Sequence, residues 1–225
     1  WEPFCTYKRH CAGCLTRKVT IIEKDDEGND VKKKVTQYYH RFVVAFLVAP
    51  NIDLTLAIEP VLPADLRKDL GAKEARHEGE LTAALRLMDR LHREYGCFID
   101  AFVLDGLYPC GPVFEKLTKY NYGAFVILKD KRKDPLRFAE EVWQLEKNPK
   151  LIETEDPYTK EQVTFRKMCD VDSLESFNGS VDVIKAVVRR KNGKKSTWTM
   201  ALLGKAKKAS PLLALRIMRS RWHIE

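Results

Sequence analysis

The chain has 225 residues, a formal net charge of +8, and a composition that is 44% hydrophobic and 32% charged. This composition supports a folded core and argues against disorder over most of the length. No apolar run approaches the roughly 18–20 residues of a membrane-spanning helix, and the N-terminus lacks the hydrophobic region of a secretory signal. We therefore expect one large domain or two small ones, and no membrane partner.

Residues 1–39 are predicted to form a cysteine-containing loop followed by a β-hairpin. The strand-like stretches RKVTIIEK (17–24) and VKKKVTQYY (31–39) flank the sequence DDEGND. Within that sequence, Gly28 and Asn29 are typical of a hairpin turn, because both residue types tolerate a left-handed backbone. The pattern therefore indicates two antiparallel strands joined by a tight turn.

The cysteines of this first region form a candidate zinc site. Cys11 and Cys14 have the Cys-x2-Cys spacing of a zinc knuckle, and thiolates together with imidazole suit tetrahedral Zn²⁺. The candidate zinc ligands are Cys5, Cys11, Cys14 and His40, with His10 as an alternative. Six cysteines in a chain of this size favour a reducing compartment over a disulfide framework, so reduced thiols in a surface loop are the competing interpretation.

Residues 40–149 are predicted to form the core, in which strands and helices alternate. HRFVVAFLVAP (40–50) and LTLAIEPVLP (54–63) are apolar strands that end at prolines. Residues 80–95 are predicted to be a helix, because apolar residues recur at i, i+4, i+7 and i+10. The expected elements that follow are a strand at 97–105, a helix at 112–120, a strand at 123–129 and a helix at 135–145.

Beyond residue 150 the pattern changes to shorter strands, which predict a β-rich insertion over 150–204. The Lys-Asn-Gly sequence at 191–193 predicts a hairpin turn between the last two of these strands. The final segment, 205–225, is predicted to be a basic helix that belongs to the core. Ser210 would be its N-cap and Pro211 its first residue.

Positive charge is concentrated at the end of the chain. From Lys185 to Glu225 there are twelve basic residues and one acidic residue, which gives this segment a net charge of +11. Such a block favours a polyanionic partner through the release of counterions. A solvated face that serves solubility is the alternative interpretation.

A single carboxylate stands at the end of an apolar strand. AFVL (101–104) is followed by Asp105 and then at once by a turn rich in glycine and proline. The near-continuous apolarity of this strand indicates a position inside a sheet, covered on both faces. Asp105 is then either an ordinary strand end or a catalytic carboxylate held on a rigid element.

Two motifs carry a resemblance to a known family. FVLDGLYPCGPVFEKL (102–117) has a strand-borne Asp followed by a small residue, Leu-Tyr and a turn, and RSRWHIE (219–225) has an Arg-x3-Glu spacing on a helix. They resemble the second Asp and part of the signature Tyr-x2-Arg-x3-Glu-x6-Lys in the DDE transposases of bacterial cut-and-paste insertion sequences. The stretch YYHRFVVAFLVAP…LAIEPVLP…EGELTAALRLMDRL also resembles the segment before that Asp in one branch of the family.

The resemblance implies an α/β fold with an RNase H-like mixed sheet. In this fold a three-strand antiparallel meander precedes alternating helices and strands, and a β-rich insertion comes before the last helix. The implied activity is metal-dependent DNA cleavage and strand transfer, in which two Mg²⁺ or Mn²⁺ ions activate the attacking oxygen and stabilise the leaving one. The implied partners are transposon ends and target DNA, bound by a homodimer in the synaptic complex. The implied location is the bacterial cytoplasm, in association with the nucleoid.

The same resemblance assigns roles to individual residues. Asp105 and Glu225 would be catalytic carboxylates that bind the Mg²⁺ ions, since hard cations prefer oxygen ligands. The candidate DNA-binding residues are Lys129, Lys207, Lys208, Arg219 and Arg221. Arg221 lies one helical turn before Glu225, so pairing with that carboxylate is its alternative role.

The sequence departs from the family pattern in three ways. Met218 occupies the place of the signature Tyr, and the signature Lys would lie beyond Glu225. No residue is an obvious first Asp of the triad. We expect the first Asp to lie upstream of residue 1. Asp25, Asp26 and Asp53 are the alternative candidates. The missing initiator Met and a final helix without a C-cap predict a piece of a longer protein.

Two other functions fit the same residues. A DNA-binding remnant of a transposase, with a zinc loop and a basic tail, would lack catalytic activity. Another RNase H-like nuclease would share the metal chemistry but not the strand-transfer step. An upstream strand that ends in Asp would support the transposase, and its absence from the natural gene would favour the remnant.

Overall fold

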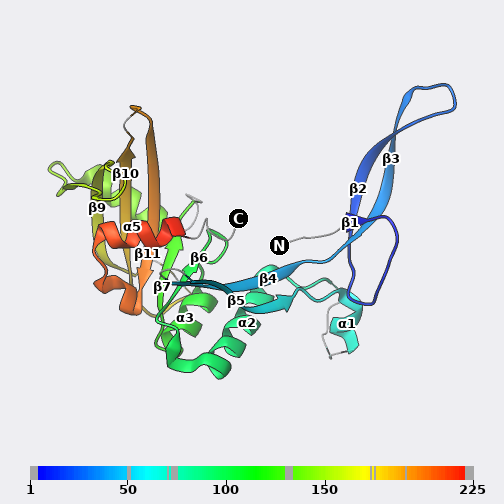
Figure 1. Ribbon diagram of the computed structural model, residues 1–225, viewed down its shortest axis with the longest axis horizontal. Helices are drawn as coiled ribbons and strands as arrows, with labels where there is room; N and C mark the ends of the chain where they lie inside the picture. The colour runs from blue at the N-terminus through cyan, green and yellow to red at the C-terminus, as the bar shows by residue number, and fades with distance from the viewer. Residues whose placement is uncertain are drawn as a thin grey trace. The chain divides into compact units, whose positions relative to one another are not determined.

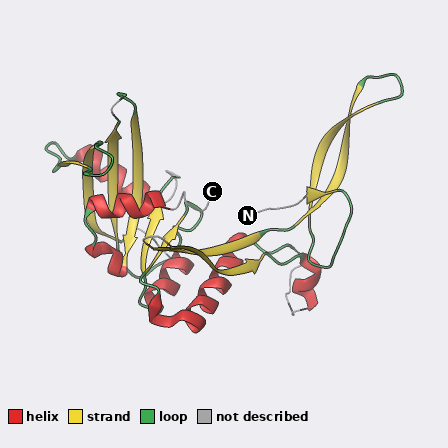
Figure 2. Ribbon diagram, in the orientation of Figure 1, coloured by secondary structure: helices red, strands yellow, loops and turns green. Residues whose placement is uncertain are grey.

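The computed structural model of the protein describes residues 5–49, 52–69, 71, 76–129, 134–172, 174, 176–190 and 192–220. It is a mixed α/β structure (Figure 1, Figure 2) that divides into two compact units, Trp1–Glu94 and Tyr95–Glu225. None of the described helices is both long enough and apolar enough to cross a membrane.

The first unit begins with a three-stranded antiparallel sheet. Its strands are β1 (Cys5–Thr6), β2 (Leu15–Lys24) and β3 (Asp30–Tyr39), with β3 in the centre. The turn at 25–29 joins β2 to β3 where the sequence predicts a hairpin. In this turn the Asp25 carboxylate accepts the backbone N–H groups of Glu27 and Asn29 at 3.0 and 2.8 Å. Gly28 supplies the positive φ of 86° that the turn requires.

A second, two-stranded antiparallel sheet is formed by β4 (Phe42–Ala49) and β5 (Ile52–Pro60). At the end of β3 both edges are occupied, because Tyr39 pairs with Cys5 on one side and with Leu15 on the other. β4 therefore has no free edge to join there. Within the described residues, the strands that precede the first long helix lie in two sheets instead of one antiparallel meander.

Two helices follow these sheets, α1 (Ala64–Asp69) and α2 (Glu80–Tyr95). α2 has the extent predicted from the sequence, and its buried face is formed by Ala83, Ala84, Leu87, Met88 and Leu91. A small core joins Leu15 at the start of β2 to Val61 and Ala83. All other residues of β2 and β3 are half-buried or exposed, so the first sheet has little hydrophobic core of its own.

The second unit is built on a six-stranded mixed sheet with the order β6-β7-β11-β10-β9-β8. Its strands are β6 (Ala101–Leu104), β7 (Gly123–Ile127), β8 (Ile152–Glu155), β9 (Gln162–Val171), β10 (Val181–Arg189) and β11 (Lys195–Leu203). β6 and β7 are parallel, and the other neighbours are antiparallel. The strands at 150–204 continue the sheet of β6 and β7, because β11 pairs directly with β7.

Helices cover both faces of this sheet (Figure 1). They are α3 (Gly111–Lys119), α4 (Asp134–Leu145) and α5 (Pro211–Ser220), and two short 3-10 helices, η1 (Gly96–Phe98) and η2 (Gly204–Lys208), precede β6 and α5. α5 packs Leu215 and Met218 onto the face that carries Ile184 of β10. Lys185, the next residue of β10, points to the opposite face, because successive side chains of a strand alternate between faces. There its ammonium lies over the ring of Trp143 from α4.

Candidate functional site

The carboxyl ends of the parallel strands β6 and β7 hold one acidic and one basic side chain. Leu104 pairs with Val126, so both strands end at the same edge of the sheet. Asp105 follows β6 directly, and Lys129 lies just beyond β7. Their side chains form an ion pair in which Lys129 Nζ is 3.2 Å from Asp105 Oδ1.

The turn after β6 fixes the direction of the Asp105 side chain. Oδ1 of Asp105 accepts the backbone N–H of Gly106 at 2.5 Å, and the Asp105 carbonyl accepts the N–H of Tyr108 at 3.0 Å. Gly106 lies close to Lys129, where an added Cβ would meet the lysine Cβ at 3.4 Å. The Asp105 side chain nevertheless remains 47% exposed, so it can be reached from solvent.

Asp105 has the chemistry of a ligand for a divalent cation, because Mg²⁺ and Mn²⁺ favour carboxylate oxygens. Among the described residues, Asp105 is not joined by two further acidic, histidine or cysteine side chains at ligand distance. The described residues therefore do not form a complete cluster of metal ligands around Asp105. Glu225 and Arg221, the other residues assigned to it from the sequence, lie outside the described residues.

The fallback candidates for the first Asp belong to the first unit. Asp25 and Asp26 lie in the turn between β2 and β3, and the Asp25 carboxylate holds that turn through its two backbone N–H donors. Asp53 lies in β5, opposite Val48 of β4. The hydrogen bonds of Asp25 give it a structural role at this position.

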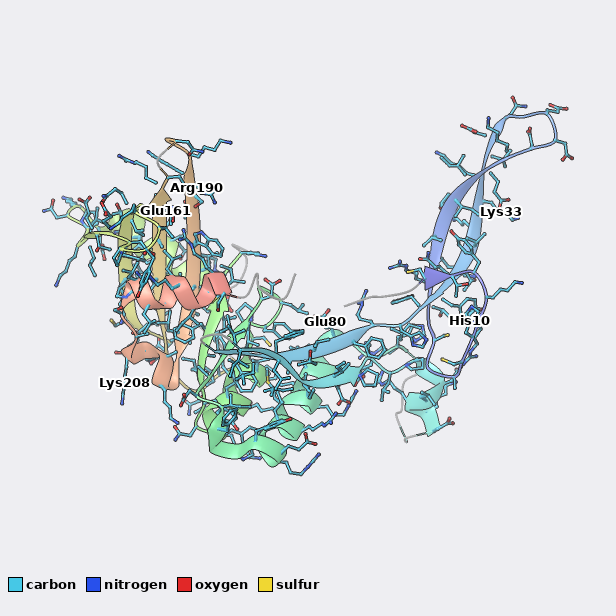
Figure 3. The ribbon with its side chains drawn as sticks, in the orientation of Figure 1. His10, Lys33, Glu80, Glu161, Arg190 and Lys208 are labelled. Carbon is cyan, nitrogen blue, oxygen red and sulfur yellow. The ribbon has the colours of Figure 1, made fainter. Side chains whose placement is uncertain are left out.

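Many basic residues of the C-terminal segment are engaged in ion pairs within the second unit. Arg219 contacts Glu161 at 2.8 Å and Lys207 contacts Asp170 at 2.8 Å, so two candidate DNA-binding side chains have internal acidic partners. Further pairs join Lys185 to Glu140, Arg190 to Glu161 and Arg216 to Asp156. Lys208 on η2 is exposed, forms no ion pair with a described residue, and lies at the other end of the sheet from Glu161 (Figure 3).

One face of the β2–β3 hairpin carries lysines that form no ion pair with a described residue. Alternate residues of a strand share a face, and the register brings Lys18, Lys24, Lys32 and Lys34 to the same one, which we call the lysine face. Lys33 belongs to the opposite face and pairs with Glu23 at 3.1 Å (Figure 3). Reasoning from net charge misses this face, because the acidic DDEGND turn offsets the charge of the strands.

Two cysteines and a histidine meet at the base of the first sheet. Cys11 and Cys14 lie in the loop between β1 and β2, and His40 directly follows β3. The two Sγ atoms are 3.8 Å apart, and His40 Nε2 lies 3.5 Å from Cys11 Sγ and 3.7 Å from Cys14 Sγ. In the part of the chain that the structure describes, these are the residues whose ligand atoms come close enough to hold a metal ion together.

The Cys14 thiol is buried and is surrounded by positive dipoles and charge. Burial raises the pKa of the Cys14 thiol, whereas hydrogen bonds from the backbone N–H groups of His10 and Cys11, and then the Arg9 cation, lower it. The lowering effects prevail, so the pKa lies below its usual value. The Cys14 thiol therefore loses its proton more readily than an ordinary cysteine does.

The other candidate zinc ligands lie apart from this cluster. Cys5 stands opposite Tyr39 in β1, and its Sγ accepts a hydrogen bond from Arg17 at 3.6 Å. His10, in the loop after β1 (Figure 3), has its Nε2 3.4 Å from Thr6 Oγ1. The structure therefore brings together three of the four residues proposed from the sequence as zinc ligands.

Two polar residues before α2 hold parts of the first unit together. Glu78 is buried, accepts the backbone N–H of Leu62 at 2.9 Å and forms an ion pair with Arg86. His77 Nε2 lies 2.9 Å from Thr16 Oγ1 at the start of β2. These contacts connect β2, the segment after β5 and α2, and they indicate a structural role.

Comparison with known proteins adds no family assignment. No protein-family model matches the chain, and no curated protein matches it at a significant level. Any function of Asp105, the lysine face or the cysteine–histidine cluster is therefore inferred from the geometry of these residues.

Proposed function

We propose that the chain is part of the catalytic region of a DDE-type DNA transposase, which cuts DNA and joins the 3′-hydroxyl ends to target DNA. The observation that best supports this function is the position of Asp105 at the carboxyl edge of the parallel pair β6–β7, oriented by its turn and open to solvent. In open α/β sheets, ligands bind outside the carboxyl ends of the strands. An RNase H-like core would hold its carboxylates at such an edge.

The proposed chemistry requires two divalent cations, which activate the attacking oxygen and stabilise the leaving oxygen. Asp105 would bind a cation through a carboxylate that the Gly106 amide already orients. Lys129, at the same edge, would bind a phosphate of the DNA. Glu225 is the second carboxylate of the proposal, Arg221 is its neighbouring phosphate contact, and the first Asp is left unassigned.

DNA is the proposed partner because several lysines form no ion pair with a described residue, although Asp30 stands opposite Lys24 on the lysine face. The lysine face of the β2–β3 hairpin supplies some of these lysines, and Lys194, Lys195 and Lys208 are others. Contacts between lysines and phosphates release counterions and favour binding. We further propose that a homodimer joins two transposon ends and acts on the nucleoid in a bacterial cytoplasm.

A nicking assay with the full-length protein tests the proposed function. Its substrate is a DNA fragment that carries the ends of the encoding element. Asp105→Asn should abolish Mg²⁺-dependent nicking while DNA binding is retained, because a carboxamide is neutral and binds the cation more weakly than a carboxylate. Asp100→Asn is the matched control, since Asp100 is an exposed residue just before the same strand, and it should nick at the unchanged rate. Full nicking by Asp105→Asn would refute the assignment.

A DNA-binding protein without catalytic activity is the second candidate. One observation favours it: among the described residues Asp105 belongs to no group of three or more potential metal ligands, whereas four lysines share one face of the β2–β3 hairpin. Such a protein would bind DNA in a strongly salt-dependent way and would show no nicking in Mg²⁺, even without substitutions. Another RNase H-like nuclease would differ from both, because it would nick DNA without joining ends.

A further inference from the structure

The cluster of Cys11, Cys14 and His40 has the geometry of a metal site. We propose that these three side chains bind one Zn²⁺ ion, which fastens the loop between β1 and β2 to the end of β3. The role of this ion is structural. The site does not depend on the transposase proposal, because it requires neither Asp105 nor DNA.

The distances among the three ligand atoms are those that a single zinc ion would impose. In a tetrahedral site, Zn–S bonds of about 2.3 Å and Zn–N bonds of about 2.0–2.1 Å place two sulfurs about 3.8 Å apart, and a sulfur and a nitrogen about 3.5 Å apart. The observed separations are 3.8 Å between the sulfurs, and 3.5 and 3.7 Å from His40 Nε2 to Cys11 Sγ and Cys14 Sγ. A disulfide would instead require the sulfurs to be about 2.0 Å apart.

The chemistry of the donors selects zinc over the harder cations. Thiolate and imidazole ligands suit Zn²⁺, whereas Mg²⁺ and Ca²⁺ take oxygen ligands. His40 would bind through Nε2, the ring nitrogen that faces both sulfurs, and would keep its proton on Nδ1. The described residues supply three of the four ligands of a tetrahedral site, and a water molecule would be the fourth.

The structure around the cluster offers few other means of holding this loop. Of the residues in β2 and β3, Leu15 alone is buried, and isolated two-stranded hairpins are marginally stable in water. The loop itself has an ion pair between Arg9 and Asp65 at 3.1 Å, which is exposed and therefore contributes little. A structural zinc ion contributes folding free energy directly, and here it would join the two strands at the base of the hairpin.

Metal analysis of the purified protein tests this site. After dialysis without chelator, we expect one zinc ion per chain by inductively coupled plasma mass spectrometry. Cys11→Ser, Cys14→Ser and His40→Asn should each weaken zinc binding by at least about 100-fold in a chelator competition. Cys5→Ser is the matched control, because this thiol belongs to the same region but lies outside the cluster, and it should retain zinc at the unchanged affinity.

If a variant fails to fold, spectroscopy on the unsubstituted protein can still identify the zinc ligands. X-ray absorption at the zinc edge should show two sulfur neighbours and two nitrogen or oxygen neighbours, and Co²⁺ in place of zinc should give thiolate charge-transfer bands. A first shell of oxygen and nitrogen alone would overturn the proposal. Zinc retention by folded Cys14→Ser or His40→Asn protein, or loss of zinc from Cys5→Ser, would also overturn it.

Discussion

Asp156 fastens the turn between β8 and β9 to α5. It is almost completely buried, and its Oδ1 accepts the backbone N–H of Tyr158 at 2.9 Å and a guanidinium N–H of Arg216 at 2.8 Å. The Arg216 hydrogen bond is the largest cause that lowers the pKa of Asp156 to about 2, although burial acts in the opposite direction. This carboxylate therefore stays ionised in the folded protein over nearly the whole pH range.

The stability of the protein should decline in acid as Asp156 becomes protonated. Its pKa in the folded state lies below the ordinary value of 3.8, so its contribution is present above that pH and is lost as the pH falls toward 2. We expect this contribution to be about 1 kcal/mol once solvent screening is considered. Arg216→Met should lower the free energy of unfolding at neutral pH and flatten its acid decline, as measured by urea unfolding with circular dichroism.

A surface arginine provides the control for this experiment. Arg137 forms an exposed ion pair with Asp134 at 2.9 Å on α4, and such pairs contribute little. Arg137→Met should leave both the stability and its pH dependence nearly unchanged. The same acid decline in Arg216→Met as in the unsubstituted protein would contradict the role of Asp156.

Among the elements, the short connections and the helix starts are predictable from the sequence. Asp25, Gly28 and Asn29 predict the β2–β3 turn, because the turn needs an acceptor for its N–H groups and a positive φ. Ser210 predicts the start of α5, and its Oγ accepts the backbone N–H of Leu213 at 3.3 Å. These signals act over a few neighbouring residues.

The order of strands in the second sheet is not predictable in this way. β7 and β11 are neighbours although α4 and three strands lie between them along the chain. Their pairing depends on which apolar faces can be buried together, and short apolar runs do not encode that choice. From the sequence, residues 150–204 therefore resemble an insertion, whereas in the structure they continue the sheet of β6 and β7.

The cysteine–histidine cluster depends on both local spacing and long-range pairing. The Cys-x2-Cys spacing is local, and the register of the hairpin brings in His40, because pairing of Leu15 with Tyr39 places Cys14 and His40 side by side beyond the strand ends. The sequence does not predict that Cys5 lies apart from the cluster. β1 pairs with the other edge of β3, a contact that no sequence pattern predicts.

The lysine face should determine how DNA binding by the hairpin depends on salt. Replacing both Lys32 and Lys34 with Gln should weaken binding and reduce the slope of log K against log salt by about 2, since each phosphate contact contributes about 0.9. Fluorescence anisotropy with a labelled duplex over a series of salt concentrations measures this slope. Lys33→Gln is the control, because Lys33 belongs to the opposite face and pairs with Glu23. If the double variant and the Lys33→Gln control had equal slopes of log K against log salt, the lysine face would not be part of the DNA interface.

Across the whole molecule, the two units differ in what stabilises them. The core of the second unit extends across its sheet, and side chains such as Phe165, Ile184 and Leu202 are fully buried. The sheet at the start of the first unit depends on the small core around Leu15 and, in our proposal, on the zinc ion. Removal of zinc should therefore affect the first unit and leave the second intact.

Limited proteolysis measures this difference directly. With a zinc-selective chelator, trypsin should cleave several-fold faster at Lys8, Arg9 and Arg17, because local opening of the loop and hairpin becomes more frequent. Cleavage at Arg166 and Lys185, in central strands of the second sheet, should be unchanged. Mass spectrometry of the fragments distinguishes the sites. Equal acceleration in both units, or in neither, would contradict a local role of zinc.

β3 leaves most of one edge without a neighbouring strand. β1 pairs only with Tyr38 and Tyr39, so among the described residues the outward N–H and C=O groups of 30–37 have no strand partner. Open edges of this kind recruit strands from other molecules and promote aggregation, and charged side chains, lysines especially, oppose such pairing. The three consecutive lysines at 32–34 lie in the part of β3 that β1 does not cover. We expect their charge to oppose strand pairing between the hairpins of neighbouring molecules.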